Sequence, residues 1–145
     1  MTATSFTTGL PETVTFVLSV FAVPDYIVRF EPGSGDVFHP PAEWAGAFAL
    51  VHECYTLQAL PPDVREHAAR SIAPLVAPGG RLLVIARARN EGEPPGTMPW
   101  PLTRSELMRF EELGLRVESF DDFLDNEDPP VRRFLAVFLR PSDST

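Results

Sequence analysis

Reactive side chains cluster at the end of one short apolar run. Residues 48–51 are followed by His52, Glu53, Cys54 and Tyr55. If the run is a strand, His52 and Cys54 share one face, because strand side chains alternate. A Cys–His nucleophile pair is then one interpretation. A cysteine that serves as a small buried hydrophobic residue is the other interpretation, and it is the commoner role of cysteine.

Other polar residues could bind a ligand or a metal. Residues 31–36 read Glu-Pro-Gly-Ser-Gly-Asp, an acid-x-Gly-x-Gly pattern whose glycines allow the backbone to approach a ligand closely. An aspartate in such a turn can instead cap its own backbone. His39, His52 and His67 lack any known spacing of metal ligands. The acidic stretch 118–128 lacks the glycine and ligand order of a calcium loop, which favours a solvated loop.

Composition excludes several classes of protein. The chain has 145 residues, of which 44% are hydrophobic, enough for one domain with a core. Its net charge is −8, so phosphate backbones repel it and we expect no nucleic-acid partner. The single cysteine cannot form an internal disulfide, which suits a reducing compartment. The apolar residues 14–23 are too short to span a bilayer and follow no basic residue, so we expect a cytoplasmic protein without membrane association.

Strands and helices that could position these residues follow from local patterns. Residues 13–23 and 26–30 are rich in β-branched and aromatic residues and predict two strands. Residues 48–53 predict a buried strand, and a helix begins at Pro61-Pro62-Asp63. Pro74 should kink or shorten this helix. The segment that follows, Ala-Pro-Gly-Gly, predicts a turn before an apolar strand, so the whole forms a βαβ unit whose parallel strands are covered on both faces.

The carboxy-terminal third predicts a helix and a hairpin. Thr103 and Glu106 have the spacing of a capping box, and Gly114 should end the helix that they begin. Residues 115–120 and 131–140 predict two strands joined by an acidic loop. Because no helix separates these strands, they should pair as an antiparallel hairpin at an edge of the sheet.

The order of these elements resembles the second half of class I S-adenosylmethionine-dependent methyltransferases. The resemblance covers about residues 26–140, and its most specific motif is the Pro-Gly-Gly turn before an apolar strand. It rests on Gly35-Asp36-Val37-Phe38, residues 48–53, residues 75–84, residues 102–107 and residues 110–115. It implies an α/β fold, a truncated Rossmann-like methyltransferase sheet that is mostly parallel and has a C-terminal antiparallel hairpin. Residues 26–145 would form a partial methyltransferase domain, preceded by an atypical N-terminal segment, residues 1–25.

The resemblance also implies an activity, the transfer of a methyl group from S-adenosylmethionine to a small-molecule acceptor. It places the carboxylate of Asp36 near the adenine amino group of the cofactor, with Gly35 and the backbone of Val37 beside it. It places Glu53 and Tyr55 at the end of the strand that delivers residues to the methyl-transfer site, as an acceptor contact or a base. Glu53 would also contact the cofactor there.

One part of the family pattern is missing. Methyltransferases of this type begin with a strand and a Gly-rich turn that contacts the methionine end of the cofactor, and residues 31–36 are too close to the next strand to be that turn. The alternatives are therefore a weakly active enzyme and a non-catalytic remnant that acts as an interaction module. An unpaired sheet edge would invite a homodimer. A third alternative is a reading frame that begins upstream with a strand and a Gly-rich turn.

Overall fold

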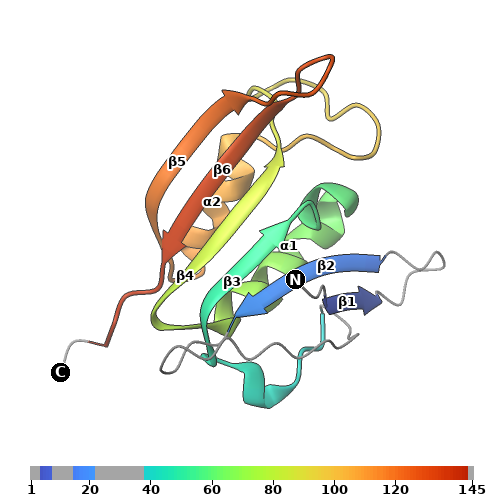
Figure 1. Ribbon diagram of the computed structural model, residues 1–145. Helices are drawn as coiled ribbons and strands as arrows, with labels where there is room; N and C mark the ends of the chain where they lie inside the picture. Colours follow the sequence, from blue (N-terminus) through green and yellow to red (C-terminus); the bar gives the residue numbers. More distant parts are fainter. Residues whose placement is uncertain (1–3, 8–14, 22–37, 144–145) are drawn as a thin grey trace.

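The computed structural model describes residues 4–7, 15–21 and 38–143, and these form one six-stranded sheet covered by two helices (Figure 1). The strand order is β1-β2-β3-β4-β6-β5. The strands are β1 Thr4–Thr7, β2 Thr15–Phe21, β3 Phe48–Cys54, β4 Val76–Arg87, β5 Arg116–Leu124 and β6 Arg132–Leu139. The helices are α1 Pro62–Ile72 and α2 Arg104–Glu112, with short 3-10 turns at Ala42–Trp44, Leu57–Ala59 and Ala73–Leu75. The predicted strand at 26–30 and the turn at 31–36 lie outside the described residues.

The sheet is mixed. Strands β3 and β4 run parallel, with Leu50 opposite Arg81 and Cys54 opposite Ile85, as the βαβ pattern predicts. The other four pairings of the described strands are antiparallel, so the expectation of a mostly parallel sheet is wrong. Strand β2 confirms the strand predicted at 13–23 and pairs with β3. The truncated Rossmann-like architecture is confirmed, and β2 joins part of the N-terminal segment to its sheet.

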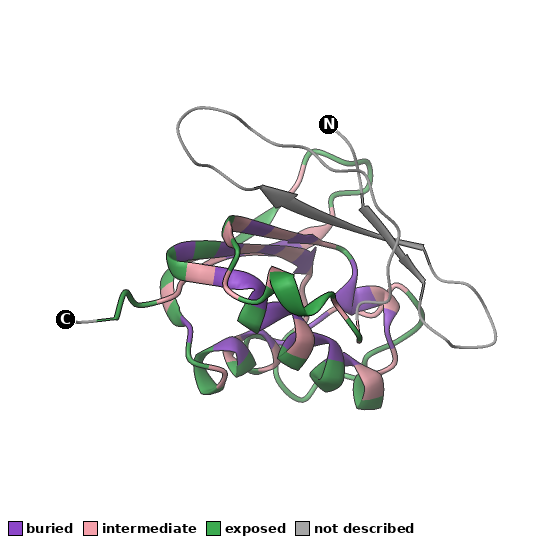
Figure 2. Ribbon diagram, turned by 90° about the horizontal axis from the view of Figure 1, so that it is seen from below, coloured by how far each residue is buried: buried purple, intermediate pink, exposed green. Residues whose placement is uncertain are grey.

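Among the described residues, helices lie on only one face of the sheet. Figure 2 shows α1 and α2 on the same side, where alternate strand residues form the core. Val51, Leu82, Val84, Ala136 and Phe138 have no exposed surface. Their neighbours on the opposite face are half-buried: Leu83, Ile85, Leu135 and Val137. The prediction that β3 and β4 are covered on both faces is therefore wrong for the described part of the chain, because no described helix lies on that side.

Helix α1 has the predicted start, and it is shortened at Pro74. Pro62 occupies its first turn, where a missing N–H costs nothing. Ala68, Ala69 and Ile72 face the core. The α-helix ends at Ile72, and Pro74 lies in the 3-10 turn that follows, which confirms that this proline shortens the helix.

The segment Pro78-Gly79-Gly80 lies inside strand β4 and is not a separate turn, which corrects the prediction. The pairing of β3 with β4 is irregular between Phe48 and Leu50. A Cβ atom on Gly80 would lie 2.8 Å from the carbonyl oxygen of Ala77 and 3.0 Å from that of Phe48. Glycine is required there because the two strands approach each other closely through their backbones.

Helix α2 has the predicted capping box. The Thr103 hydroxyl accepts a hydrogen bond from the Glu106 amide at 3.2 Å, and the Glu106 carboxylate accepts one from the Thr103 amide at 2.7 Å. Gly114 follows the helix with a φ of +90°, a conformation that glycine adopts without strain. Both predicted ends of α2 are confirmed.

The C-terminal hairpin is confirmed, but β5 is longer than predicted. It continues through Asp121 and Asp122 to Leu124, residues assigned from the sequence to the acidic loop. Asp122 forms a bidentate ion pair with Arg132 across the two strands at 2.7 and 2.8 Å. This cross-strand pair allows an acidic segment to remain in the sheet.

Candidate functional site

Several chain segments converge at one edge of the sheet. Strands β3 and β4 end there, β5 turns into β6 there, and both helices begin there (Figure 1). The loop of residues 88–103, which connects β4 to α2, also lies at this edge. Ligands of open α/β sheets bind outside the carboxyl ends of the strands. We refer to this region, where the carboxyl ends of β3 and β4 lie, as the carboxyl edge. The name does not refer to an outer strand of the sheet.

Glu53 is a fully buried acid at the carboxyl edge. Its Oε1 accepts hydrogen bonds from the backbone amides of Thr56 at 2.6 Å and Leu57 at 3.0 Å. Its second oxygen, Oε2, is buried without a hydrogen-bond partner among the described residues. Burial raises the pKa of Glu53 to about 7, although the two amides and the nearby Thr56 hydroxyl oppose this change. A carboxyl group with this pKa can accept and release a proton near neutral pH.

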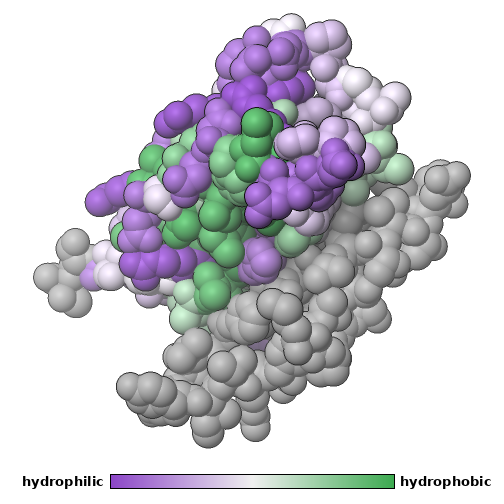
Figure 3. All heavy atoms as spheres, turned by 45° about the horizontal axis from the view of Figure 1, so that its top comes forward, coloured by the Kyte–Doolittle hydropathy of each residue, from purple (hydrophilic) through white to green (hydrophobic). Residues whose placement is uncertain are grey.

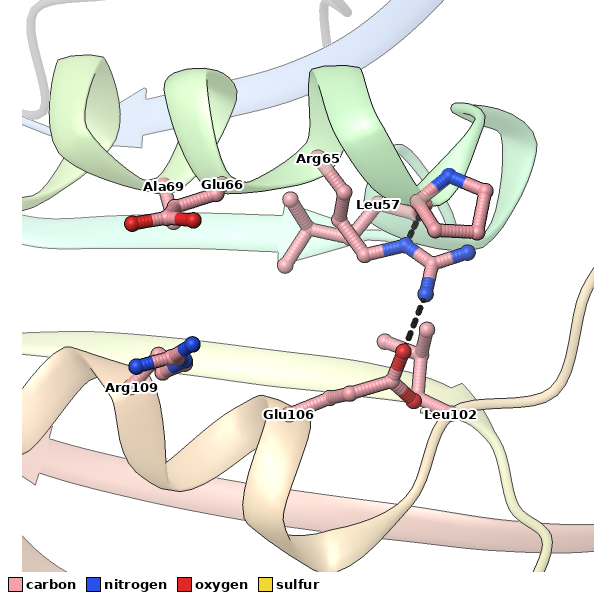
Figure 4. A pocket seen from close by; sticks show the side chains of 8 residues that line it. Leu57, Arg65, Glu66, Ala69, Leu102, Glu106 and Arg109 are labelled. Carbon is pink, nitrogen blue, oxygen red and sulfur yellow. Dashed lines mark hydrogen bonds and ion pairs between the residues drawn. The ribbon is translucent and has the colours of Figure 1, made fainter.

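Arg65 supports the turn that holds Glu53. Its Nε donates to the carbonyl oxygen of Leu57 at 3.0 Å, and its Nη2 donates to that of Leu60 at 3.1 Å. Its Nη1 forms an ion pair with Glu106 of α2 at 2.6 Å (Figure 4). One buried guanidinium therefore joins α1, α2 and the turn after β3. The sequence analysis did not identify this residue. The spacing could have identified it, because Arg65 precedes Ala68 and Ala69 by three and four residues and therefore lies on the same face of the helix as these buried alanines.

Tyr55 leaves the strand in an unusual conformation. Its φ is +63°, a value that residues other than glycine rarely adopt. Its amide donates to the carbonyl oxygen of Ile85 at 3.2 Å, and its side chain is 37% exposed. The guanidinium of Arg133 lies over the Tyr55 ring, 5.1 Å from the ring centroid. Strained residues of this kind concentrate at functional sites, so the conformation is consistent with a role for Tyr55.

His52 and Cys54 are half-buried on the face of β3 that carries no helix. Burial lowers the pKa of His52 and raises the pKa of Cys54, so both groups are neutral near pH 7. A neutral thiol is a weak nucleophile. The structure therefore favours the interpretation of Cys54 as a small, partly buried apolar side chain.

Arg133 organises the turn between β5 and β6. Its guanidinium forms ion pairs with Asp125 and Glu127. The side chain of Asp125 is only 14% exposed, and its Oδ1 accepts hydrogen bonds from two backbone amides of the turn. Most of the acidic segment is exposed as predicted, but Asp125 corrects that prediction because it is an internal part of the turn.

The cofactor contacts implied at Gly35, Asp36 and Val37 lie outside the described residues. They stay predictions. Within residues 38–143 and the two N-terminal strands, no group of three or more His, Cys, Asp or Glu side chains could hold a metal ion.

A cavity of about 160 Å³ lies between α1 and α2 (Figure 4). Leu57, Arg65, Leu102 and Glu106 line its end nearest the carboxyl edge. Arg65 already donates to two carbonyl groups and to Glu106, which leaves little capacity to bind a ligand. Ligand sites usually measure about 300 Å³ or more, so we assign this cavity to helix packing.

Solved structures with the same fold are methyltransferases and related enzymes. A SAM-dependent methyltransferase from Methanosarcina mazei superposes with a TM-score of 0.62 at 11% identity, over 83% of this chain and 74% of that chain. The 1,6-didemethyltoxoflavin-N1-methyltransferase of Burkholderia thailandensis, solved with S-adenosylhomocysteine bound, gives 0.57 at 13% identity, over 74% and 49%. The cyclase SpnF gives 0.61 at 13% identity, over 77% and 56%.

The chain therefore has the fold of class I S-adenosylmethionine-dependent methyltransferases. No protein-family model and no curated protein matches it. It spans about half the length of the B. thailandensis enzyme and of the cyclase. Because one fold supports several chemistries, activity has to be argued from the site. No helix in the described part of the chain is long and apolar enough to cross a membrane.

Proposed function

We propose that the chain transfers a methyl group from S-adenosylmethionine to a small-molecule acceptor, and that Glu53 accepts the proton that the acceptor loses. The observation that carries this proposal is the buried carboxyl group of Glu53 at the carboxyl edge of a methyltransferase fold. Its free Oε2 can take a proton, and its pKa of about 7 matches that task. The sulfonium carbon is already activated, so alignment and proton removal are what the protein has to supply.

Binding of the cofactor is expected to be weak. The residues proposed for the acceptor side, Glu53 and Tyr55, are among the described residues, and Asp36 is the proposed contact on the adenine side. Fewer contacts with the cofactor give a less favourable binding free energy, while the entropic cost of holding the ligand stays similar. We therefore expect a dissociation constant above about 1 mM for S-adenosylhomocysteine, which corresponds to about −4 kcal/mol.

Saturation-transfer NMR on the 145-residue chain can measure this binding, and radiolabelled S-adenosylmethionine can measure methyl transfer to a panel of small acceptors. Glu53→Gln should lower the rate of methyl transfer about 100-fold or more. Glu118→Gln, on the exposed part of β5, is the control and should leave this rate unchanged. Absence of any cofactor binding at 10 mM would refute the proposal. Micromolar binding that Asp36→Ala removes would show that the cofactor site is complete.

A second candidate function is that of an interaction module that forms a homodimer. The edge of β3, which would be unpaired in a truncated sheet, is occupied by β2. The opposite edge of the sheet is β5, which carries Asp121 and Asp122 and so resists pairing with another strand. The open face of the sheet is the better surface. Figure 3 shows a hydrophobic area there, to which the half-buried Leu83, Ile85, Leu135 and Val137 belong.

Sedimentation velocity over a range of protein concentrations tests this second candidate. We expect a dimer that Val137→Glu dissociates, because a carboxylate cannot be buried unpaired in an apolar interface. Glu112→Arg, on the helix side, is the control and should leave the dimer intact. A monomer at all concentrations up to 200 μM would exclude a stable dimer.

A further inference from the structure

Two buried polar atoms in the turn after β3 have no hydrogen-bond partner among the described residues. They are Oε2 of Glu53 and the hydroxyl oxygen of Thr56. Glu53 is fully buried, and Thr56 is 2% exposed. A buried polar atom without a partner costs free energy, and most such atoms in folded proteins have one. Two of them in a single turn therefore require an explanation.

Capping of the turn does not explain the Thr56 hydroxyl. Thr56 is the N-cap residue of the 3-10 turn Leu57–Ala59, and a hydroxyl in an N-cap position commonly accepts a hydrogen bond from a backbone amide. The Thr56 side chain makes no such bond. Glu53 binds the free amides of the turn instead, because its Oε1 accepts from Thr56 and Leu57. The hydroxyl is therefore available for another partner.

That partner is the carboxyl group of Glu53. Burial, the larger effect, raises the pKa of Glu53 to about 7, and the Thr56 hydroxyl opposes it together with the two backbone amides. A hydroxyl has this effect when it lies close enough to donate toward the ionised carboxylate. The terminal torsion of a glutamate rotates easily, so the carboxyl group can turn Oε2 toward the hydroxyl.

Other titratable side chains near this turn do not compete for the carboxyl group. His52 and Cys54 alternate with it along β3 and lie on the opposite face of the sheet. On the helix side, Arg65 of α1 and Arg89 of the loop after β4 both bind Glu106 of α2. None of these five side chains forms a hydrogen bond with the buried carboxyl group among the described residues, which leaves the hydroxyl as its neighbour.

We propose that Thr56 is the positioning residue of Glu53, and that its hydroxyl is the hydrogen-bond partner of Oε2 in both protonation states. The hydroxyl donates to Oε2 when Glu53 is ionised, and it accepts from Oε2 when Glu53 is protonated there. A hydroxyl can do both because it rotates, so a proton can enter and leave Glu53 without an unpaired buried atom. This inference rests on the proposed function, in which Glu53 accepts the proton of the acceptor.

Titration of Glu53 in the full chain tests the inference without cofactor. Carbon-13 NMR follows the side-chain carboxyl signals from about pH 4 to about pH 10, and the signal missing in Glu53→Gln is that of Glu53. Thr56→Val replaces the hydroxyl with a methyl group of similar size. A hydrogen bond to an ionised group is stronger than one to a neutral group, so its loss should raise the midpoint of Glu53 by about one pH unit.

Thr56→Ser keeps the hydroxyl and should titrate as the original chain does, which a role of the threonine methyl group alone would not produce. Thr97→Val, in the exposed part of the loop after β4, is the matched control and should leave the midpoint unchanged. If Thr56→Val does not fold, Thr56→Ala is titrated in its place. An unchanged midpoint without the hydroxyl, or a midpoint in Thr56→Ser raised as far as in Thr56→Val, would overturn the inference.

The pH dependence of methyl transfer separates this inference from the proposed function. The pH of half-maximal rate should rise in Thr56→Val by the same amount as the midpoint of Glu53, and Thr56→Ser should restore it. A rate profile that does not follow the midpoint would overturn the positioning role of Thr56. A raised midpoint in a chain that transfers no methyl group at any pH would support the pairing of Thr56 with Glu53 and remove the proposed methyl transfer.

Discussion

Replacing Glu53 by glutamine is expected to make the protein more stable than the original chain at pH 8, and to remove a large part of the pH dependence of its stability. The pKa of Glu53 rises from 4.5 to about 7 on folding because the side chain is fully buried. A raised pKa in the folded state means that the protonated form stabilises the fold. This contribution is fully present below pH 4.5, decreases as the pH rises through 7, and is lost above it.

The expected size is about 3 kcal/mol between pH 4.5 and pH 8, since each pKa unit corresponds to about 1.4 kcal/mol. Urea unfolding at both pH values gives the change in the free energy of unfolding for each chain. Subtracting the change in Glu53→Gln from that in the original chain removes the contribution of the other titrating groups. Glu118→Gln is the control. The pKa of Glu118 is lowered by its hydrogen bond with Arg81, so its effect has the opposite sign. The same pH dependence in Glu53→Gln and the original chain would contradict the burial of an ionisable Glu53.

Replacing Arg65 by methionine is expected to destabilise the fold by about 3 kcal/mol or more, because it breaks a buried ion pair. The side chain of Arg65 is 7% exposed, and the substitution removes its donors to the carbonyl groups of Leu57 and Leu60, of which that of Leu57 keeps the Leu60 amide at 3.2 Å. Glu106 keeps a hydrogen bond from the Thr103 amide and a longer contact with Arg89 at 3.3 Å. Because Glu106 keeps these partners, we expect the loss of stability to lie at the lower end of the range for broken buried ion pairs.

The matched control is Arg70→Met on the same helix. Arg70 pairs with Glu66 at 2.7 Å, but both side chains are at least half exposed, so the expected loss is below about 1 kcal/mol. Arg65→Lys keeps the charge and loses the forked geometry, and it should give an intermediate loss in a chain that still folds. Chemical unfolding at pH 7 measures all three variants. Similar losses for Arg65→Met and Arg70→Met would show that the contacts of Arg65 contribute little.

Local patterns predicted much of the fold. The start of α1 at Pro62 and the capping box of Thr103 and Glu106 depend on residues close together in the sequence. The parallel pair of β3 and β4 followed from the helix predicted between two apolar runs. Glu53 and Tyr55 were predicted as site residues because the resemblance places them at the end of the strand that leads to the methyl-transfer site, and this assignment stays a prediction. Short-range signals of this kind survive because the hydrogen bonds that they describe are themselves short-range.

Features that depend on distant residues could not be predicted. The Arg65–Glu106 pair joins residues 41 positions apart. The extension of β5 through Asp122 depends on Arg132 in the partner strand. The raised pKa of Glu53 depends on the burial of its side chain by the folded chain, which no local pattern indicates. The absence of a described helix on the second face of the sheet also could not be predicted, since parallel strands usually pack helices on both faces.

The position of β6 has a consequence for how the chain folds during synthesis. The last strand of the sequence lies inside the sheet, between β4 and β5 (Figure 1). Until Arg132–Leu139 has left the ribosome, β5 lacks its only partner among the described strands and β4 has one side open. Pairing of β4 with β6 also requires a long loop to close, which slows folding. The nascent chain therefore completes this sheet only after β6 has been synthesised, and deletion of β6 would remove the strand that joins β5 to β4.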